Sequence, residues 1–324
     1  MNHVFGPVPS RRLGRSLGID PVPSKTCNWN CVYCQLGRSS PLVIERKQYF
    51  DPAEIINEVE NKLNLISPTN IDWITFVGSG ETMLHTGIGW MIGQLKNITQ
   101  LPIAVITNGS LLYLPNIRNE LLQADAVLPS LDAGDAQLYK KINRAHPQFT
   151  YQQLVEGLIT FRKEYSQKIW VEIMLVKGLN DSPTNLRKIA NIMQSVQPDE
   201  IHILQPTRAP AEPWVQNPEE ETLLQARTIL GEKAKVVGPS TATFNLYGGK
   251  SLAEAIVGII TRHPMKQEEI INTLANWTSK DIVEILEELK NSGKVKMVIR
   301  NGISFWTASS GYFPDAHHSI SGKQ

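Results

Sequence analysis

The sequence predicts an α/β protein whose larger part is a partial (β/α)6 TIM-like barrel and whose smaller part is a C-terminal winged-helix domain. Two observations support this prediction. Short apolar segments alternate with helical ones at a spacing of roughly thirty residues, which is the period of a β/α unit. The pattern then changes to short helices and a hairpin near Tyr247. We expect the barrel over residues 1–246, the winged-helix domain over 247–307 and a disordered tail over 308–324.

The predicted barrel strands are short apolar runs of the kind found in buried parallel sheets. They lie at residues 16–20, 71–77, 103–107, 126–131, 169–176 and 200–204. Helices are expected at residues 51–65, 87–96, 117–123, 182–195 and 218–230. The first helix begins at Asp51 and Pro52, an N-cap followed by proline at the first helical position. In a β/α barrel the loops at the carboxyl ends of the strands form the active site.

The C-terminal segment is predicted to contain three amphipathic helices and a hairpin, at residues 252–262, 266–276, 279–291 and 294–306. The hairpin turns at Asn301 and Gly302. In a winged helix with this order, the helix before the hairpin is the one that enters DNA. Here that helix is rich in acidic residues, so DNA is not expected as a partner. The hairpin is basic, so RNA and an acidic peptide are candidate partners for it, and a packing module without a ligand is the equal alternative.

Composition excludes several classes of protein. The 32 Lys and Arg residues nearly balance the 31 Asp and Glu residues, so overall charge does not hold a nucleic acid. No segment approaches the roughly 18 apolar residues of a membrane span, and the first residues have no secretory apolar core. Three cysteines are too few for a disulfide framework. We expect a cytoplasmic protein with no membrane partner.

All three cysteines fall within the string TCNWNCVYC, as Cys27, Cys31 and Cys34. Three unrelated buried thiols are one interpretation. A zinc site is another, because thiolates at short spacing bind zinc, but it needs a fourth ligand such as His3, His85 or His146. The third interpretation is a [4Fe-4S] cluster held by three thiolates, which leaves one iron without a protein ligand. Such an iron is a place for chemistry.

The spacing Cys-x3-Cys-x2-Cys, with Tyr33 immediately before the last cysteine, resembles the signature of the radical S-adenosylmethionine (SAM) superfamily. The resemblance implies a partial barrel and a [4Fe-4S] cluster whose open iron binds the amino and carboxylate groups of SAM. In that superfamily an electron from the cluster breaks the sulfonium C–S bond. Methionine and a 5′-deoxyadenosyl radical result, and the radical takes a hydrogen atom from the substrate. A flavodoxin- or ferredoxin-type reductant is expected as a partner.

Residues 6–38 most resemble the branch grouped with wyosine-type tRNA-modifying enzymes. Wyosine synthases use further cysteines for a second cluster, and this chain has none left. The cysteine count also disfavours other enzymes with auxiliary clusters. The resemblance therefore predicts an enzyme with one cluster.

Polar or glycine-rich strings follow all six predicted strands. They are the cysteine loop, Gly78-Ser79-Gly80-Glu81, Thr107-Asn108-Gly109, Ser130-Leu131-Asp132, residues 177–181 and residues 205–208. Each alone is ordinary turn chemistry. Because all six occupy the same place in the β/α unit, they predict one functional rim.

By the resemblance, Gly78, Gly80 and Glu81 match the motif that contacts the methionine amino group of SAM. Glycine lets backbone approach a ligand closely, and Glu81 supplies a carboxylate for an ammonium group. Glu81 also fits an acidic residue at a helix N-terminus.

The resemblance assigns the ribose and carboxylate of SAM to four further residues, Thr107, Asn108, Ser130 and Asp132. It places Tyr33 near the adenine. Asp132 fits the cap of the following helix equally well.

Four arginines are candidates for contacting an anionic substrate, because a guanidinium fork matches carboxylates and phosphates. Arg11, Arg12 and Arg15 precede the first predicted strand, and Arg208 follows the last. The alternatives for the first three are a solvated basic loop or a contact with the SAM carboxylate.

The sequence thus predicts a radical SAM oxidoreductase or modifying enzyme. Its substrate is left open among a tRNA base, a protein or peptide, and a small molecule. The alternative from another class is a redox-sensing regulator, in which an iron–sulfur cluster is the switch and the winged helix binds DNA or protein. The acidic third helix and the elaborated barrel rim favour the enzyme.

Overall fold

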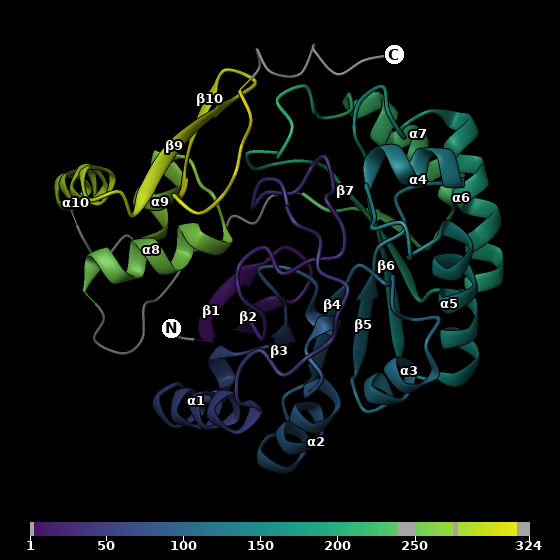
Figure 1. Ribbon diagram of the computed structural model, residues 1–324, viewed down its shortest axis with the longest axis horizontal. Helices are drawn as coiled ribbons and strands as arrows, with labels where there is room; N and C mark the ends of the chain where they lie inside the picture. The colour runs from purple at the N-terminus through teal and green to yellow at the C-terminus, as the bar shows by residue number, and fades with distance from the viewer. Residues whose placement is uncertain (1–2, 239–250, 275–277, 316–324) are drawn as a thin grey trace.

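The larger part of the molecule is a curved eight-stranded sheet (Figure 1). The computed structural model describes residues 3–238, 251–274 and 278–315. The strands are β1 Val4–Ser10, β2 Gly14–Ile19, β3 Trp73–Phe76, β4 Ile103–Thr107, β5 Ala126–Pro129, β6 Lys168–Met174, β7 Glu200–Leu204 and β8 Ala234–Val236. Their order in the sheet follows the chain. β1 is antiparallel to β2, and β2 to β8 are parallel, so the predicted parallel barrel strands are present as β2 to β7.

Helices cover the outer side of the sheet (Figure 1). They are α1 Pro52–Leu65, α2 Ile88–Ile98, α3 Pro115–Leu121, α4 Ala136–Ile142, α5 Tyr151–Glu164, α6 Pro183–Val196 and α7 Glu220–Leu230. Two short 3-10 turns are η1 Pro68–Asn70 and η2 Thr82–Leu84. Helix α1 begins as predicted, with the Asp51 side chain accepting a hydrogen bond from the backbone N–H of Ala53 at 2.9 Å.

Four elements of the barrel were not predicted, namely β1, β8, α4 and α5. The prolines of β1, Pro7 and Pro9, argue against a strand because they have no N–H for a ladder. The structure accommodates them because β1 is an edge strand, which has a partner on one side only. β8 has three residues, which is too short for a periodic pattern.

The two faces of the sheet bury different clusters. The outer side chains of the strands pack against the helices in the main core. The inner side chains of β4, β5 and β6 form a smaller cluster that includes Ala104, Leu128 and Trp170. Leu13, from the turn between β1 and β2, is 2% exposed and belongs to this inner cluster. The turn therefore enters the barrel.

The C-terminal unit has three helices and a hairpin in the predicted order. They are α8 Leu252–Arg262, α9 Gln267–Thr273, α10 Ser279–Asn291, β9 Val295–Arg300 and β10 Ile303–Ala308. β9 and β10 pair antiparallel across Asn301 and Gly302, which both have positive φ, as a type I′ turn requires. The helices and the hairpin share a core around Ile260, Leu286 and Trp306. The small antiparallel sheet is confirmed, and the winged-helix interpretation stays a prediction.

This unit packs beside the β1–β2 hairpin (Figure 1). Arg262 of α8 donates to Asp20 at the end of β2 (Nε to Oδ2, 2.9 Å), and its guanidinium lies 4.7 Å from the ring centroid of Phe5. Arg300 of β9 is buried and donates to the carbonyls of Pro210 and Pro314. The basic hairpin is thus partly used within the molecule.

The first residues of the C-terminal tail pack against the barrel. Phe313 is buried beside Ala209 and Phe305, and the backbone N–H of Arg38 donates to the carbonyl of Tyr312 at 2.8 Å. Residues 316–324, for which disorder is also expected, lie outside the described residues, as does the predicted boundary at 246/247. Among the helices described, none is both long and apolar enough to cross a membrane.

Candidate functional site

A cavity of about 250 Å³ lies at the carboxyl ends of the parallel strands. It brings together most of the residues that the sequence singles out, namely Cys27, Cys31, Cys34, Tyr33, Gly78, Gly80, Glu81, Thr107, Asn108, Ser130, Arg11 and Arg208. The prediction that the strand-end loops meet at one rim therefore holds for five of the six loops. The exception is the loop after β6, residues 177–181, which does not line the cavity. Asn180 of this loop is fully buried and donates to the carbonyls of Asp132 and Met174, so the loop closes on its own strand end.

Each cysteine sulfur faces a hydrogen-bond donor. The backbone N–H of Trp29 lies 3.4 Å from Cys27 Sγ. Asn143 Nδ2 lies 3.8 Å from Cys31 Sγ, and Lys25 Nζ lies 3.7 Å from Cys34 Sγ. Donors around sulfur stabilise thiolates and tune an iron–sulfur cluster. Lys25 and Asn143 were not predicted as site residues, and of the two only Lys25 carries a signal in the sequence, its position beside the cysteine motif.

The geometry disfavours the zinc alternative. Within the described residues, no three His, Cys, Asp or Glu side chains converge as ligands of a single metal ion. Thiolates of one tetrahedral zinc lie about 3.8 Å apart, because each Zn–S bond is about 2.3 Å. His3 instead pairs with Glu58, and His85 is held between Phe50 and Gly87. Three cysteines that line one cavity without converging on one ion fit a cluster, which offers each thiolate a separate iron.

Without a metal, the burial of Cys27 and Cys31 opposes deprotonation of their thiols. Burial, followed by the nearby Glu81 carboxylate, raises the pKa of Cys27 to about 12, and burial also raises the pKa of Cys31. Iron reverses this preference, since a coordinated thiol is deprotonated. Assembly of a cluster here therefore releases protons.

The loop after β3 is joined to the cysteine loop by backbone hydrogen bonds. The N–H of Glu81 donates to the Thr26 carbonyl at 2.8 Å, and the N–H of Lys25 donates to the Ser79 carbonyl at 2.7 Å. A Cβ at Gly80 would lie 1.9 Å from the Thr26 carbonyl oxygen. This corrects one expectation, because the missing side chain of Gly80 makes room for the cysteine loop as well as lining the cavity.

Glu81 is a buried carboxylate held by three donors. Thr107 Oγ1 donates to Oε1 at 2.5 Å, the N–H of Asn108 donates to Oε2 at 2.7 Å, and the N–H of Met83 donates to Oε1 at 3.0 Å. Glu81 thus caps the short turn η2, in agreement with the alternative of an acidic residue at a helix N-terminus, and it also lines the cavity. Burial raises its pKa against the opposing effect of these hydrogen bonds. The carboxylate is oriented and has no hydrogen-bonded cation among the described residues, which suits an ammonium ligand.

Thr107 and Asn108 orient Glu81, and Asn108 also supports the cysteine loop. Asn108 Nδ2 donates to Asn28 Oδ1 at 2.7 Å, and Asn28 Nδ2 donates to Ser110 Oγ at 2.7 Å. Asn28 is fully buried between Cys27 and Cys31. The loops after β2, β3 and β4 therefore form one hydrogen-bonded assembly.

Asp132 lies behind the cavity wall. Its carboxylate accepts from the Tyr33 hydroxyl at 2.5 Å, from Asn143 Nδ2 at 2.6 Å and from the N–H of Met174 at 2.7 Å. Burial raises the pKa of Asp132. Asp132 does not cap the next helix, since the cap of α4 is Asp135. The expected contact between Asp132 and the SAM ribose is corrected to a role in positioning Tyr33, because its oxygens are occupied and it does not line the cavity.

The four candidate arginines separate into two groups. Arg11 and Arg208 line the cavity. Arg12 enters the barrel and pairs with Glu172 of β6, so it does not line the cavity. Arg15 pairs with Asp72 at 2.9 Å and is half exposed. As the second residue of β2, it lies at the end of the strand opposite the rim, which rules it out as a contact in this cavity.

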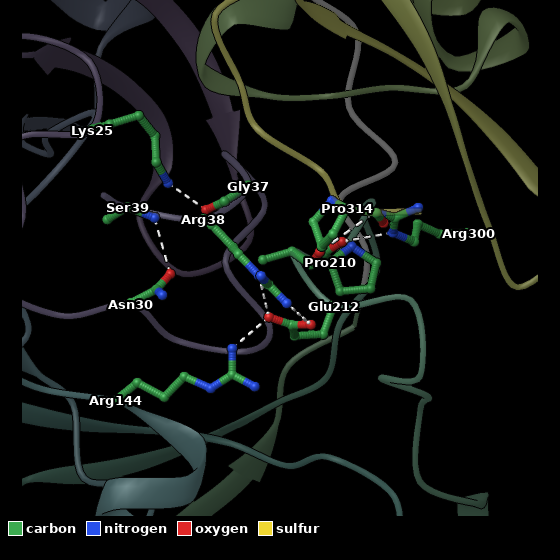
Figure 2. A network of polar contacts seen from close by, with 11 residues as sticks. Lys25, Asn30, Gly37, Arg38, Ser39, Arg144, Pro210, Glu212, Arg300 and Pro314 are labelled. Atoms are coloured by element: carbon green, nitrogen blue, oxygen red, sulfur yellow. Dashed lines mark hydrogen bonds and ion pairs between the residues drawn. The ribbon is translucent and has the colours of Figure 1, made fainter. Parts of the chain in front are cut away.

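Glu212, which the sequence analysis missed, links the cysteine loop to two other segments. Its side chain is 1% exposed and forms ion pairs with Arg38, at 2.7 Å, and with Arg144 (Figure 2). Arg38 follows the cysteine motif, and Arg144 follows α4. Figure 2 also shows Lys25 bonded to the Gly37 carbonyl, inside the same loop. No short motif marks Glu212, since its partners are distant in sequence.

Comparisons with known proteins agree with this geometry. The sequence profile of the Radical SAM superfamily matches residues 22–188. A UPF0026 protein of Methanocaldococcus jannaschii is 32% identical over 311 residues, which cover 94% of this chain and 96% of that protein. A protein named GTPase Obg from Brachyspira hyodysenteriae is 36% identical over 303 residues, 93% of this chain, and the chain spans 44% of that relative's length.

A solved structure supports the fold. A radical SAM methyltransferase from Sphaerobacter thermophilus has a TM-score of 0.53 and 18% identity, covering 68% of this chain and 66% of that one. The redox-regulator alternative gains no support from these relatives, and the wyosine-type detail stays a prediction. The profile match runs from the cysteine loop through Glu81 and Asp132, and the chain therefore belongs to the radical SAM superfamily, whose cofactors are a [4Fe-4S] cluster and SAM.

Proposed function

We propose that this chain is an enzyme that cleaves SAM reductively with one [4Fe-4S] cluster bound by Cys27, Cys31 and Cys34. The observation that carries the proposal is that three cysteines of one loop and the buried carboxylate of Glu81 face a single cavity. The chain has no other cysteine, which supports a single cluster. We further propose residues 1–246 as the catalytic domain and 247–307 as a winged-helix-like domain.

When bound, the cofactors supply the radical chemistry: an electron from a flavodoxin- or ferredoxin-type donor cleaves SAM to methionine and a 5′-deoxyadenosyl radical, which abstracts hydrogen from the substrate. The residues of the chain bind and orient. Glu81 receives the ammonium group of SAM, with its oxygens fixed by Thr107 and Asn108. Ser130 and Tyr33 line the space available for the nucleoside. Asp132 accepts hydrogen bonds from the Tyr33 hydroxyl and from Asn143, and so holds Tyr33 in its place in the cavity wall.

The test is anaerobic reconstitution with iron and sulfide, followed by addition of dithionite and SAM. We expect 5′-deoxyadenosine and methionine in equal amounts from the wild-type protein and none from Cys31→Ala. Iron and sulfide analysis shows whether each protein holds a cluster. Electron paramagnetic resonance of the reduced cluster provides a second readout, because SAM bound at the open iron changes the spectrum. An intact reduced cluster with no spectral change on adding SAM and no product would contradict the proposal.

A further inference from the structure

The cavity has a second region of chemical interest around Arg11 and Arg208. Arg11 comes from the turn between β1 and β2, and Arg208 from the segment after β7. Arg11 donates to the hydroxyl of Thr207, the residue before Arg208, with an Nη1 to Oγ1 distance of 3.1 Å. Two segments distant in sequence thus bring two guanidinium groups to one part of the wall.

The positive charge of this region is not balanced within the described chain. Arg12, the third arginine nearby, has Glu172 as its partner. Arg208 makes no hydrogen bond or ion pair with any residue that the structure describes, and Glu269 of α9 acts on it only through longer-range electrostatics. Burial and the charge of Arg11 lower the pKa of Arg208 to about 10. Burial and the charges of Arg11 and Arg208 lower that of Arg12 to about 9.

A further unsatisfied group lies at the same junction. His263, which follows α8 in the C-terminal unit, is close enough to Arg208 and Arg262 for their charges to lower its pKa in addition to the effect of burial. Its Nδ1 atom is buried and has no hydrogen-bond partner among the described residues. Arg208 is partly buried, and polar groups that are removed from water without a partner are unfavourable unless a ligand satisfies them.

We propose that Arg11 and Arg208 bind the phosphate group of a phosphorylated small-molecule substrate. This rests on the proposed function, since it names the substrate class of the same cavity. Two guanidinium groups that have no carboxylate partner in the described part of the chain match the double negative charge of a phosphate monoester, and their donor forks match its oxygens. A carboxylate carries one negative charge and would leave the second arginine uncompensated.

The surroundings favour a small molecule over RNA. The C-terminal unit covers this side of the rim, where Gln35 donates to the Arg262 carbonyl at 2.9 Å and Arg262 pairs with Asp20. Arg300, one of the basic residues of the hairpin, is buried against carbonyls and does not offer a surface to a phosphodiester backbone. The net charge of +1 supplies no long-range attraction for a polyanion.

The test measures binding of inorganic phosphate to the reconstituted full-length protein by isothermal titration calorimetry, without reductant and in a phosphate-free buffer. We expect Arg208→Gln and Arg11→Gln to raise the Kd for phosphate roughly tenfold or more, as for loss of a charge-assisted hydrogen bond. Arg227→Gln, on the exposed face of α7, is the matched control and should leave the Kd unchanged. Arg208→Lys should give an intermediate Kd, because it keeps the charge and loses the fork.

Thermal unfolding gives a readout that does not depend on calorimetry. Phosphate should raise the Tm of the wild-type protein and of Arg227→Gln, and should not raise that of Arg208→Gln. Without phosphate, Arg208→Gln should melt no lower than the wild type, since it removes a partly buried charge that has no hydrogen-bond or ion-pair partner among the described residues. A fall in its Tm would show that Arg208 has a structural partner and would overturn the proposal.

Three other outcomes would overturn it. If the wild-type protein does not bind phosphate, the proposed phosphate site does not exist. Displacement of phosphate by SAM alone assigns the arginines to the SAM carboxylate. Competition by bulk tRNA at lower concentration than by a small phosphate monoester assigns them to a nucleic acid. Because no reductant is present, phosphate binding stands or falls separately from the 5′-deoxyadenosine assay of the proposed function.

Discussion

The two ends of the cavity differ in how their charged groups are satisfied. At the cofactor end, the Glu81 carboxylate accepts three hydrogen bonds from the chain, and every cysteine sulfur has a donor. At the arginine end, Arg11 has one hydroxyl partner and Arg208 makes no hydrogen bond or ion pair with the residues described. The first end is organised before any ligand binds. The second is complementary to a charge that the described chain does not supply.

This difference indicates which substitutions should disturb the structure of the protein and which should affect only the binding of a ligand. A change at the cofactor end disturbs loops that support one another. A change at the arginine end removes a charge that few residues depend on. Substitutions at the two ends should therefore differ in effect, and the largest effect is expected where two loops touch.

Replacing Gly80 by alanine should abolish cluster assembly. The new Cβ would lie 1.9 Å from the Thr26 carbonyl, which is backbone and belongs to the loop that carries Cys27. The two loops must separate, so the cysteines lose their arrangement. We expect Gly80→Ala to retain little iron and sulfide after reconstitution and to lose the visible absorption of the cluster.

The matched control is Gly93→Ala on α2. Its new Cβ would meet only the end of the Gln123 side chain at 3.6 Å, an ordinary contact, and alanine favours the helix by up to about 1 kcal/mol. Gly93→Ala should therefore load iron as the wild type does. Normal cluster content in Gly80→Ala would refute the view that the loops depend on each other.

Replacing Glu81 by glutamine should weaken SAM binding while the cluster still assembles. The loss of one charge-assisted hydrogen bond to an ammonium group, about 1.5–3 kcal/mol, corresponds to a roughly ten- to hundredfold higher Kd. Because the pKa of Glu81 is raised, wild-type affinity should fall as the pH is lowered towards that pKa and the carboxylate becomes neutral. The affinity of Glu81→Gln should stay flat over the same range. Equilibrium binding of SAM to the reconstituted protein at several pH values measures both, with exposed Glu60→Gln as the control.

Some features of the molecule could be predicted from the sequence and others could not, depending on whether their signal is local in the chain. The β/α alternation, the cysteine loop and Glu81 were predictable because their signals are local, such as the period of a β/α unit or three cysteines in eight residues. The roles of Gly80, Asp132 and Arg15 were not, because each depends on what lies opposite it in space. Arg11 and Arg15 are four residues apart, yet Arg11 lines the cavity while Arg15 pairs with Asp72 at the opposite end of β2. Strand β1 was missed because its prolines are tolerated only at an edge.

Replacing Glu212 by glutamine should destabilise the fold by about 2–3 kcal/mol. The side chain is buried between Arg38 and Arg144, so its removal leaves two guanidinium groups facing each other. Removing one partner of a fully buried ion pair destabilises a fold by about 3–5 kcal/mol. We expect a smaller destabilisation here because both arginine side chains are about one-third exposed. Burial acts to raise the pKa of Glu212, but the hydrogen bonds from the arginines outweigh it and the pKa is lowered.

The sign of the pH dependence follows from this shift. A lowered pKa means that Glu212 contributes stability above the pKa of an unfolded glutamate, about 4.3, and loses it as the pH falls through the folded value. Urea unfolding measures the free energy of unfolding of the wild type and of Glu212→Gln. The difference between the two values should therefore be largest at neutral pH and should become smaller in acid. A constant difference across that range would mean that the ion pairs contribute nothing.

Replacing Arg15 by glutamine should have the smallest effect. Arg15 and Asp72 are about half exposed, and exposed ion pairs contribute roughly 0–1 kcal/mol because solvent screens them. We expect a fall in the free energy of unfolding within that range, and no change in the phosphate Kd that Arg11→Gln raises. The two variants remove the same group from positions four residues apart. Equal effects on phosphate binding would show that general positive charge near the N-terminus attracts the anion. An effect confined to Arg11 would mean that the position of the guanidinium in the cavity matters, because the two substitutions change the net charge equally.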